Sequence, residues 1–177
     1  MNYHGTTILG IVRDGLAVIA GDGQVTHGET IIKANSQKVR FLADGKILAG
    51  FAGGAADALT LLALFEEKLG ERKDLVRAAA DMAKQWRTDK FLQRLMAELI
   101  VLDKEKVLLI TGAGDVLEAE DGVIAIGSGA GYAIAAARSM IAFGKKMSIR
   151  EIAENALKIA SKICVYTNEN ITVLELK

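Results

Sequence analysis

The chain has 177 residues, 51% of them hydrophobic and 25% charged, which suits one globular domain with a sizeable core. Its 22 basic and 22 acidic residues give a formal net charge of zero, which argues against a general attraction to nucleic acids or membrane surfaces. A single cysteine, Cys164, excludes an intrachain disulfide and favours a reducing compartment, and no apolar run approaches the ~18 residues of a membrane span.

A short leader, MNYHG, precedes two threonines, Thr6 and Thr7. It has neither the positive region nor the apolar region of a secretory signal, so we expect a cytoplasmic protein. The first residues of a domain usually fray. A leader can also cover a reactive group, and the rest of the sequence has to decide between these two interpretations.

The first half of the chain has the pattern of β-strands. Asp14-Gly15 and Asp44-Gly45 each lie between apolar runs, which is a strong indication of a hairpin. A polar, glycine-rich stretch, GDGQVTHGE, separates the two hairpins and is expected to be a loop. Together the turns predict a β-meander. The expected strands cover residues 6–13, 16–21, 30–33, 38–42 and 46–54.

The periodicity then changes to that of helices. Apolar residues recur at helical spacing from Ala55 to Leu69, and Gly70 is expected to end this helix. Asp74 can cap a second helix, which places Leu75 and Trp86 on one apolar face.

The second half repeats this order. Ser148 and Glu151 form a capping box that opens the last helix, which is expected to end near Cys164. Grouped strands followed by grouped helices indicate an α+β fold, and two sheets with two helix pairs suggest four layers, α-β-β-α. The remaining expected elements are strands at 97–103, 106–112, within 115–129 and at 171–176, and a helix at 129–143.

The residues exclude the commonest hydrolytic sites. The two histidines, His4 in the leader and His27 in the polar loop, are better explained as exposed residues than as bases, and there is no G-x-S-x-G motif. Cys164 lies on an apolar helical stretch, which favours a buried structural thiol over a nucleophile. Cysteine and histidine pairs at the spacing of zinc ligands are missing.

The glycine-rich segment AIGSGAGYA (125–133) follows an expected strand and opens an expected helix. This context fits a dinucleotide-binding turn, so a nucleotide-binding enzyme using Gly127–Gly131 is one alternative. The spacing is G-x-G-x-G and no βαβ unit surrounds it, which favours a tight strand-to-helix turn whose amides could still serve an active site.

The opening threonines offer another nucleophile. An N-terminal threonine carries its own base, because its α-amine, with a pKa of about 7.7–8.0, can accept the hydroxyl proton. This requires cleavage between Gly5 and Thr6, and glycine hinders attack by the Thr6 hydroxyl on that bond very little. From these residues alone, the start of a strand is the simpler interpretation of Thr6-Thr7.

Seven motifs together make the chain resemble the HslV family, the peptidase subunits of bacterial HslUV proteases. These motifs are TTILGIV, GDGQV, KVR, LAGFAGG, WRTDK, AIGSGAGYA and ICVYTN. That family is similar to the β subunits of the proteasome and belongs to the N-terminal nucleophile hydrolases. The resemblance covers nearly the whole chain from Thr6 onward. It implies an α-β-β-α sandwich, in agreement with the element order above.

The resemblance also implies roles for five residues. Thr6 matches the nucleophile, and Lys38 matches a lysine that lowers the pKa of the α-amine. Asp22 would hold that lysine charged and oriented. The backbone N–H of Gly50 would stabilise the oxyanion, a contribution of about 3 kcal/mol to the barrier. Ser128 would orient the amine.

The family binds a monovalent cation through backbone carbonyls of a G-x-x-C-x-x-T motif, which matches Ser161, Cys164 and Thr167 here. Ser161 departs from the glycine of the family, and a left-handed backbone there would be unfavourable for serine. At this site we therefore expect no more than a structural Na⁺ ion. We expect no cofactor for the chemistry.

The implied organisation is a leader over residues 1–5, removed on maturation, and a single peptidase domain over 6–177. The family forms two stacked hexameric rings capped by HslU-type AAA+ ATPase hexamers and degrades unfolded proteins. The chain has no Walker A motif, so ATP would be used by the partner only. A non-catalytic ring subunit of the same fold is the second alternative.

Overall fold

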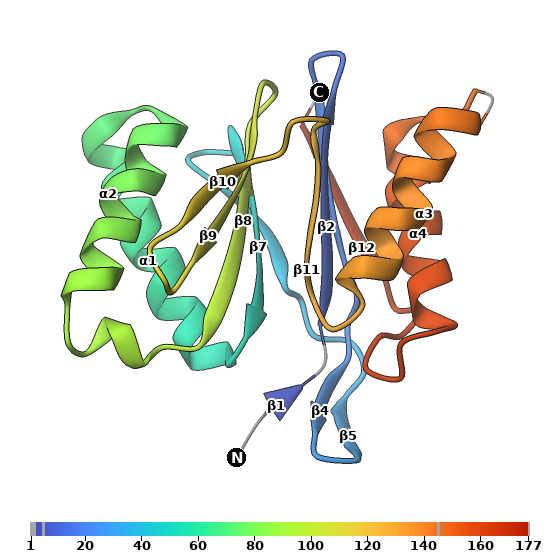
Figure 1. Cartoon of the computed structure of the whole chain (residues 1–177), viewed down its shortest axis with the longest axis horizontal. Helices are drawn as coiled ribbons and strands as arrows, with labels where there is room; N and C mark the ends of the chain where they lie inside the picture. Colours follow the sequence, from blue (N-terminus) through green and yellow to red (C-terminus); the bar gives the residue numbers. More distant parts are fainter. Residues whose placement is uncertain (1–2, 5, 145, 177) are drawn as a thin grey trace.

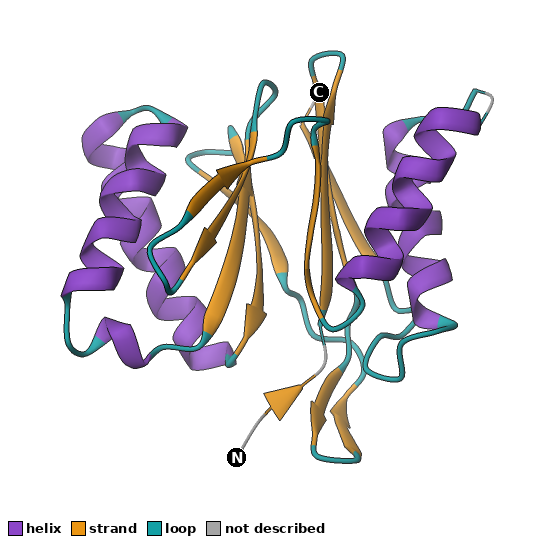
Figure 2. Cartoon of the chain, viewed as in Figure 1, coloured by secondary structure: helices purple, strands orange, loops and turns teal. Residues whose placement is uncertain are grey.

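The computed structural model describes residues 3–4, 6–144 and 146–176, with backbone only at 3–4 and 55. The chain forms four layers, with a helix pair on each outer face and two sheets between them (Figure 1). Figure 2 shows that the helices lie only in the outer layers. The predicted α-β-β-α sandwich is confirmed. The helices are α1 (Ala55–Arg72), α2 (Leu75–Thr88), α3 (Ala130–Phe143) and α4 (Ile149–Ser161), with a 3-10 turn η1 (Leu92–Arg94) after α2.

Both large sheets are antiparallel throughout. The four-stranded sheet has the order β11-β2-β3-β12 and packs against α3 and α4; its strands are β2 (Thr7–Arg13), β3 (Leu16–Gly21), β11 (Val123–Gly127) and β12 (Thr172–Leu176). The five-stranded sheet has the order β10-β9-β8-β7-β6 and packs against α1 and α2. Its strands are β6 (Val39–Leu42), β7 (Ile47–Gly53), β8 (Ala97–Leu102), β9 (Val107–Thr111) and β10 (Val116–Glu118).

The prediction of one meander in the first half is wrong. The Asp14-Gly15 turn has positive φ values of 52° and 75° and joins β2 to β3, whereas Asp44-Gly45 joins β6 to β7 in the other sheet. Hydrophobic faces on both hairpins are buried between the sheets, so the two hairpins face each other instead of pairing edge to edge.

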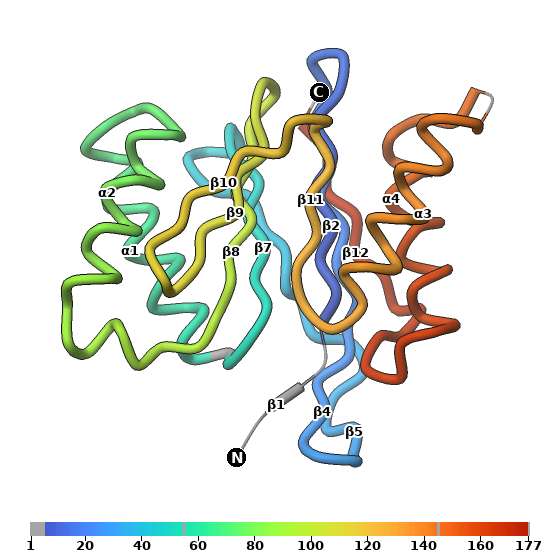
Figure 3. The backbone as a smooth tube through the Cα atoms, viewed as in Figure 1, coloured from blue at the N-terminus to red at the C-terminus, as the bar shows by residue number. Residues whose placement is uncertain are grey.

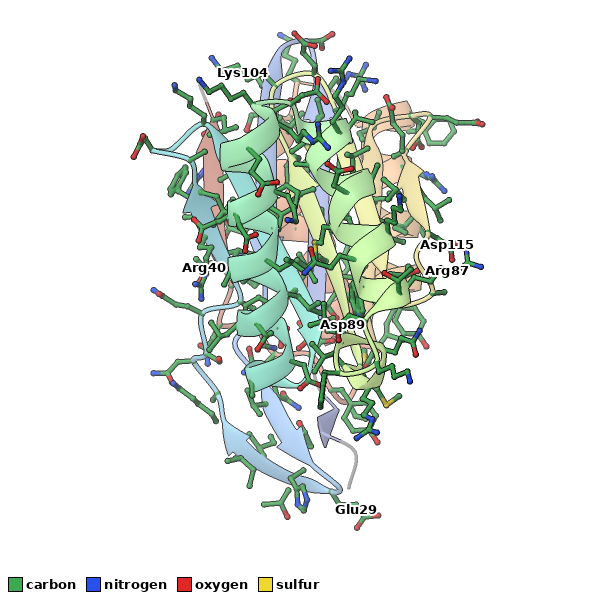
Figure 4. All side chains as sticks on the ribbon, turned by 90° about the vertical axis from the view of Figure 1, so that its left-hand side faces the viewer. Glu29, Arg40, Arg87, Asp89, Lys104 and Asp115 are labelled. Carbon is green, nitrogen blue, oxygen red and sulfur yellow. The ribbon has the colours of Figure 1, made fainter. Side chains whose placement is uncertain are left out.

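A small third sheet combines two strands from the segment between these hairpins with one strand of the leader. β4 (Val25–His27), which falls in the predicted polar loop, pairs with β5 (Thr30–Lys33) and with β1 (Tyr3–His4) of the leader. The backbone tube shows the β4–β5 hairpin projecting from one end of the four layers (Figure 3). In the view onto α1 and α2, Glu29 marks the tip of the β4–β5 hairpin, away from the helices (Figure 4).

Two helix ends differ from the expectation. α1 continues through Gly70 to Arg72, and Lys73, with a φ of 54°, supplies the left-handed cap by donating its N–H to Leu69. Gly70 lies on an open face of the helix, where glycine costs only about 1 kcal/mol. α4 ends at Ser161, and Cys164 lies in the loop after it.

The helix starts agree with the sequence. The Asp74 side chain accepts a hydrogen bond from Arg77 N at 2.8 Å, and both halves of the Ser148–Glu151 capping box are formed. The apolar face of α2 is buried against the five-stranded sheet, including Leu75 and Trp86. No helix among the described residues is long and apolar enough to cross a membrane.

Candidate active site

Thr6 lies directly before β2, an internal strand of the four-stranded sheet, and is 6% exposed. Its carbonyl oxygen accepts a hydrogen bond from Ser128 N at 2.9 Å. The next residue, Thr7, is fully buried and pairs with Gly127 of β11. The backbone at Thr6 is therefore held at the edge of a packed core and does not fray.

A buried ion pair lies beside this backbone. Lys38 Nζ is 2.9 Å from Asp22 Oδ1, and the two side chains are 3% and 0% exposed. Asp22 follows β3 and Lys38 precedes β6, so the pair joins the two large sheets. The same Oδ1 accepts a hydrogen bond from Thr7 N at 2.8 Å. Asp22 thus connects the lysine ammonium to the chain immediately after Thr6.

The carboxylate of Asp22 is fully engaged. Its second oxygen, Oδ2, accepts hydrogen bonds from Gln24 N at 2.9 Å and from Asn168 N at 3.3 Å. Lys38 Nζ also donates to the carbonyl oxygen of Gln24. Three backbone N–H groups and the Lys38 ammonium therefore satisfy both oxygens of this buried carboxylate, which is what a buried charge requires.

Burial is the main influence on Lys38, and it lowers the pKa of the ammonium group. The charge of Asp22 and its hydrogen bond act in the opposite direction and favour the protonated form. As the pH is raised toward the ordinary lysine pKa, Lys38 should therefore lose its proton at a lower pH than exposed lysines do.

We expect this order in a pH titration followed by NMR of ¹³C-labelled lysine side chains. Lys38 should titrate below the ordinary lysine value of 10.5. Lys106 should titrate above 10.5, because the Glu118 carboxylate accepts its hydrogen bonds and raises its pKa. Lys38→Arg identifies the Lys38 signal. Titration of Lys38 together with Lys106 would contradict the burial argument.

Gly50 lies on β7 in register with Val39, the neighbour of Lys38, and the adjacent Phe51 N donates to Lys38 O at 3.2 Å. A Cβ atom at this position would lie 2.7 Å from Ile8 Cγ2 and 2.8 Å from Ile19 Cδ1. Glycine is thus required where the two sheets meet. The structure places Gly50 beside the lysine, and its role as oxyanion donor stays a prediction.

The turn from β11 into α3 packs directly onto the two threonines. Gly127 has a φ of +87°, and a Cβ atom there would lie 2.1 Å from Thr6 O. Ser128 N and Gly129 N donate to Thr6 O and Thr7 Oγ1, at 2.9 and 3.0 Å. Both amides therefore have partners on Thr6 and Thr7. Because β11 also pairs antiparallel with β2, the segment is the expected tight strand-to-helix turn and not a dinucleotide-binding turn. The role of the Ser128 side chain stays a prediction.

The predicted cation-binding residues lie at the end of α4 and in the loop after it. Ser161 is the last residue of α4, and its φ is not positive, so the missing glycine is no obstacle to this backbone. Cys164 is buried, as expected for a structural thiol, and its carbonyl accepts a hydrogen bond from Thr167 N at 3.1 Å, which leaves a lone pair for a cation. Binding of a cation by the carbonyls of these three residues stays a prediction.

Asn168 is a site residue that sequence reasoning missed. Besides its N–H to Asp22, its Oδ1 accepts from Gly23 N at 3.2 Å and its Nδ2 donates to Ala34 O at 2.8 Å. It fixes the loop that carries Asp22 to the segment that leads toward Lys38. The sequence includes Asn168 only as the last residue of the ICVYTN motif and does not indicate this role, because Asp22, Gly23 and Ala34 lie more than 130 residues away. The predicted exposure of His27 is also wrong, since it is half-buried on β4.

Comparisons with known proteins agree with this geometry. The family model described as "Proteasome subunit" matches residues 2–176. The chain is 52% identical to the ATP-dependent protease subunit HslV of Anaeromyxobacter, over 98% of each chain. It is 51% identical to HslV of Borrelia duttonii, over 99% of each chain. The crystal structure of eukaryotic HslV from Trypanosoma brucei superimposes with a TM-score of 0.92 at 43% identity, over 97% of this chain and 99% of the other. The chain therefore belongs to the proteasome subunit family and, within it, to the HslV group.

Proposed function

We propose that the chain is the peptidase subunit of an ATP-dependent protease that cuts unfolded proteins into peptides. Thr6 is the nucleophile and becomes N-terminal when residues 1–5 are removed. The observation that carries this proposal is the buried Lys38–Asp22 pair, joined through Asp22 Oδ1 to the backbone beside Thr6. The HslV names of relatives at about half identity support the same activity.

The reaction follows from an N-terminal threonine. The Thr6 hydroxyl attacks the substrate carbonyl while the α-amine takes its proton, and Gly50 N–H stabilises the oxyanion. The protonated amine then gives its proton to the leaving amine, which leaves an acyl ester on Thr6. Water, deprotonated by the same amine, hydrolyses the ester. The Lys38 ammonium disfavours a second positive charge nearby and so keeps the amine free, and Ser128 orients it.

The leader contributes to this site before it is removed. The backbone of Tyr3–His4 pairs with β4 in the register Tyr3↔His27 and His4↔Thr26. Residues 3–4 of the uncut chain are therefore held as a short strand beside β4. Attack of the Thr6 hydroxyl on the Gly5 carbonyl, followed by hydrolysis of the ester, would release the leader and free the amine. Gly5 itself lies outside the described residues.

The assembly is part of the proposal. The subunits form two stacked hexameric rings that enclose the active sites, in a cytoplasmic particle capped by HslU-type AAA+ ATPase hexamers. The ATPase supplies unfolding, because the sequence contains no Walker A motif. A sodium ion held by the carbonyls of Ser161, Cys164 and Thr167 would stabilise the loop after α4; it takes no part in the bond cleavage.

Degradation of an unfolded protein tests the function. The purified particle is incubated with casein, with and without an HslU-type ATPase and ATP, and peptide products are counted by mass spectrometry. We expect rapid degradation only when ATPase and ATP are both present, while a short fluorogenic peptide is cleaved at a lower rate by the particle alone. Saturable binding of NAD or ATP to the isolated chain, without peptide cleavage, would favour the nucleotide-binding alternative.

A further inference from the structure

We propose that Thr7 is a positioning residue for the Thr6 nucleophile, and that its hydroxyl fixes Thr6 against both the Ser128–Gly129 turn and the loop that contains Thr167. This inference deepens the proposed function and rests on Thr6 being the nucleophile. The resemblance assigns Thr7 no role beyond its place in the strand.

The hydroxyl of Thr7 is completely enclosed and has two partners. Thr7 Oγ1 accepts a hydrogen bond from Gly129 N at 3.0 Å, and it lies 2.7 Å from Thr167 Oγ1, with which it shares a second hydrogen bond. Thr7 and Thr167 are 0% and 5% exposed. A Cβ atom at Gly129 would lie 2.3 Å from Thr7 Oγ1, so the turn can approach the hydroxyl only because residue 129 is glycine.

Packing alone does not account for a threonine at this position. Valine has nearly the same shape, suits a strand equally well and carries no polar atom that must be satisfied in a core. The surrounding strand residues Ile8, Leu9 and Ile11 are indeed apolar and fully buried. The hydroxyl therefore serves its two partners, and both partners belong to segments of the candidate site.

Three segments that are distant in sequence meet at this one residue. The first segment contains Asp22: Thr7 N donates to Asp22 Oδ1 at 2.8 Å, and Asp22 N donates to Thr7 O at 3.1 Å. Its side chain reaches the other two segments, at Gly129 and Thr167. Thr6 precedes Thr7 by one peptide bond, so a shift of Thr7 moves the reacting amine and hydroxyl. A misplacement of about 1 Å is enough to cost roughly 10²-fold in rate.

Thr167 gives the arrangement a second consequence. Its carbonyl is one of the three proposed cation ligands, and its hydroxyl contacts Thr7. The loop after α4 is thereby linked to the chain beside Thr6 by this pair of hydroxyl groups, in addition to the hydrogen bond from Asn168 N to Asp22.

The test compares Thr7→Val, Thr7→Ser and Thr167→Val in the full-length chain. A peptide vinyl sulfone that alkylates the threonine hydroxyl gives a reversible binding constant and a rate of inactivation for each assembled particle. Intact mass gives the fraction of chains that begin at Thr6, and each rate is divided by that fraction. Thr111→Val is the matched control, because Thr111 is a half-buried strand threonine of β9 whose hydroxyl donates to Asp115 at 3.3 Å and lies outside the candidate site.

We expect Thr7→Val to lower the inactivation rate by about 10-fold or more, with the binding constant unchanged, because the nucleophile is misplaced and the peptide-binding surface is not. Thr7→Ser should restore most of the rate, Thr167→Val should show a smaller loss, and Thr111→Val should match the wild type. A Thr7→Val chain that keeps its leader while Thr7→Ser loses it also supports the proposal, since the Thr6 hydroxyl is the proposed nucleophile of that cleavage.

Equal rates for Thr7→Val and the wild type would overturn the positioning role. An equally low rate for Thr7→Ser would overturn it too, since the hydroxyl would then not be the group that matters. Either result leaves the proposed function standing if Thr6→Ala remains unreactive. A reactive Thr6→Ala particle would instead refute the proposed function.

Discussion

Replacing Thr6 with alanine is expected to abolish peptide hydrolysis, with a loss of about 10⁴-fold or more, because the acyl ester is proposed to form on the Thr6 hydroxyl. The substitution removes only the hydroxyl and a methyl group at the start of β2, and the Ser128 N–H to Thr6 O hydrogen bond is made by the backbone. The assembled particle and its thermal stability should therefore be preserved. Turnover of a fluorogenic peptide by the purified particle measures the effect.

Thr60→Ala provides the matched control. Thr60 lies on the exposed face of α1, and its hydroxyl donates to Ala56 O at 3.1 Å within the same helix. Its replacement should leave turnover unchanged. Turnover by the Thr6→Ala particle at the wild-type rate would show that the nucleophile is wrongly assigned. A wild-type particle that cleaves no peptide, although it has an N-terminal Thr6, would favour the non-catalytic ring subunit.

Replacing Asp22 with asparagine is expected to destabilise the subunit by about 3–5 kcal/mol and to reduce turnover sharply. The change leaves the Lys38 ammonium buried without its counter-charge, which is the costly way to break a buried ion pair. An amide also offers one acceptor oxygen where the carboxylate offers two, so some of the donors from Thr7, Gln24 and Asn168 lose their partner. Denaturant unfolding and peptide turnover of the same preparations measure both effects.

Two further variants separate stability from chemistry. Glu118→Gln breaks the surface pair with Lys106, whose side chains are 50% and 39% exposed, and should cost less than about 1 kcal/mol. The double variant Asp22→Asn/Lys38→Met removes the buried charge as well, so it should regain much of the stability but none of the activity. An Asp22→Asn protein as stable and active as the wild type would contradict the account of this ion pair.

Local patterns in the sequence predict most elements of the fold. Alternating apolar runs, Asp-Gly turns and helix caps are set by nearby residues, and α2 begins after Asp74 with the expected face buried. The sheet to which each hairpin belongs is set by contacts that are distant in sequence. Nothing local indicates that β2–β3 and β6–β7 face each other, or that the leader pairs with β4. The end of α1 depends on the conformation of Lys73, which overrides the usual effect of Gly70.

The candidate site also has features that the sequence predicts and contacts that only the folded structure shows. The resemblance to HslV predicts Thr6, Asp22 and Lys38 as site residues, because each belongs to a short, specific sequence motif. The geometry adds how they are joined, through an Asp22 carboxylate that accepts hydrogen bonds from Thr7, Lys38 and Asn168. Contacts such as Thr7 with Thr167, which are 160 residues apart, have no local signature. They appear only when the chain has folded.

The intact mass of the subunit in a peptidase-active particle decides whether Thr6 acts as an N-terminal nucleophile. We expect the active chain to lack the mass of residues 1–5 and to begin at Thr6, with a free α-amine that N-terminal sequencing detects. A fully active particle in which every chain still carries Met1 through Gly5 would refute this mechanism, because the base and the nucleophile are proposed to be one residue with a free amine.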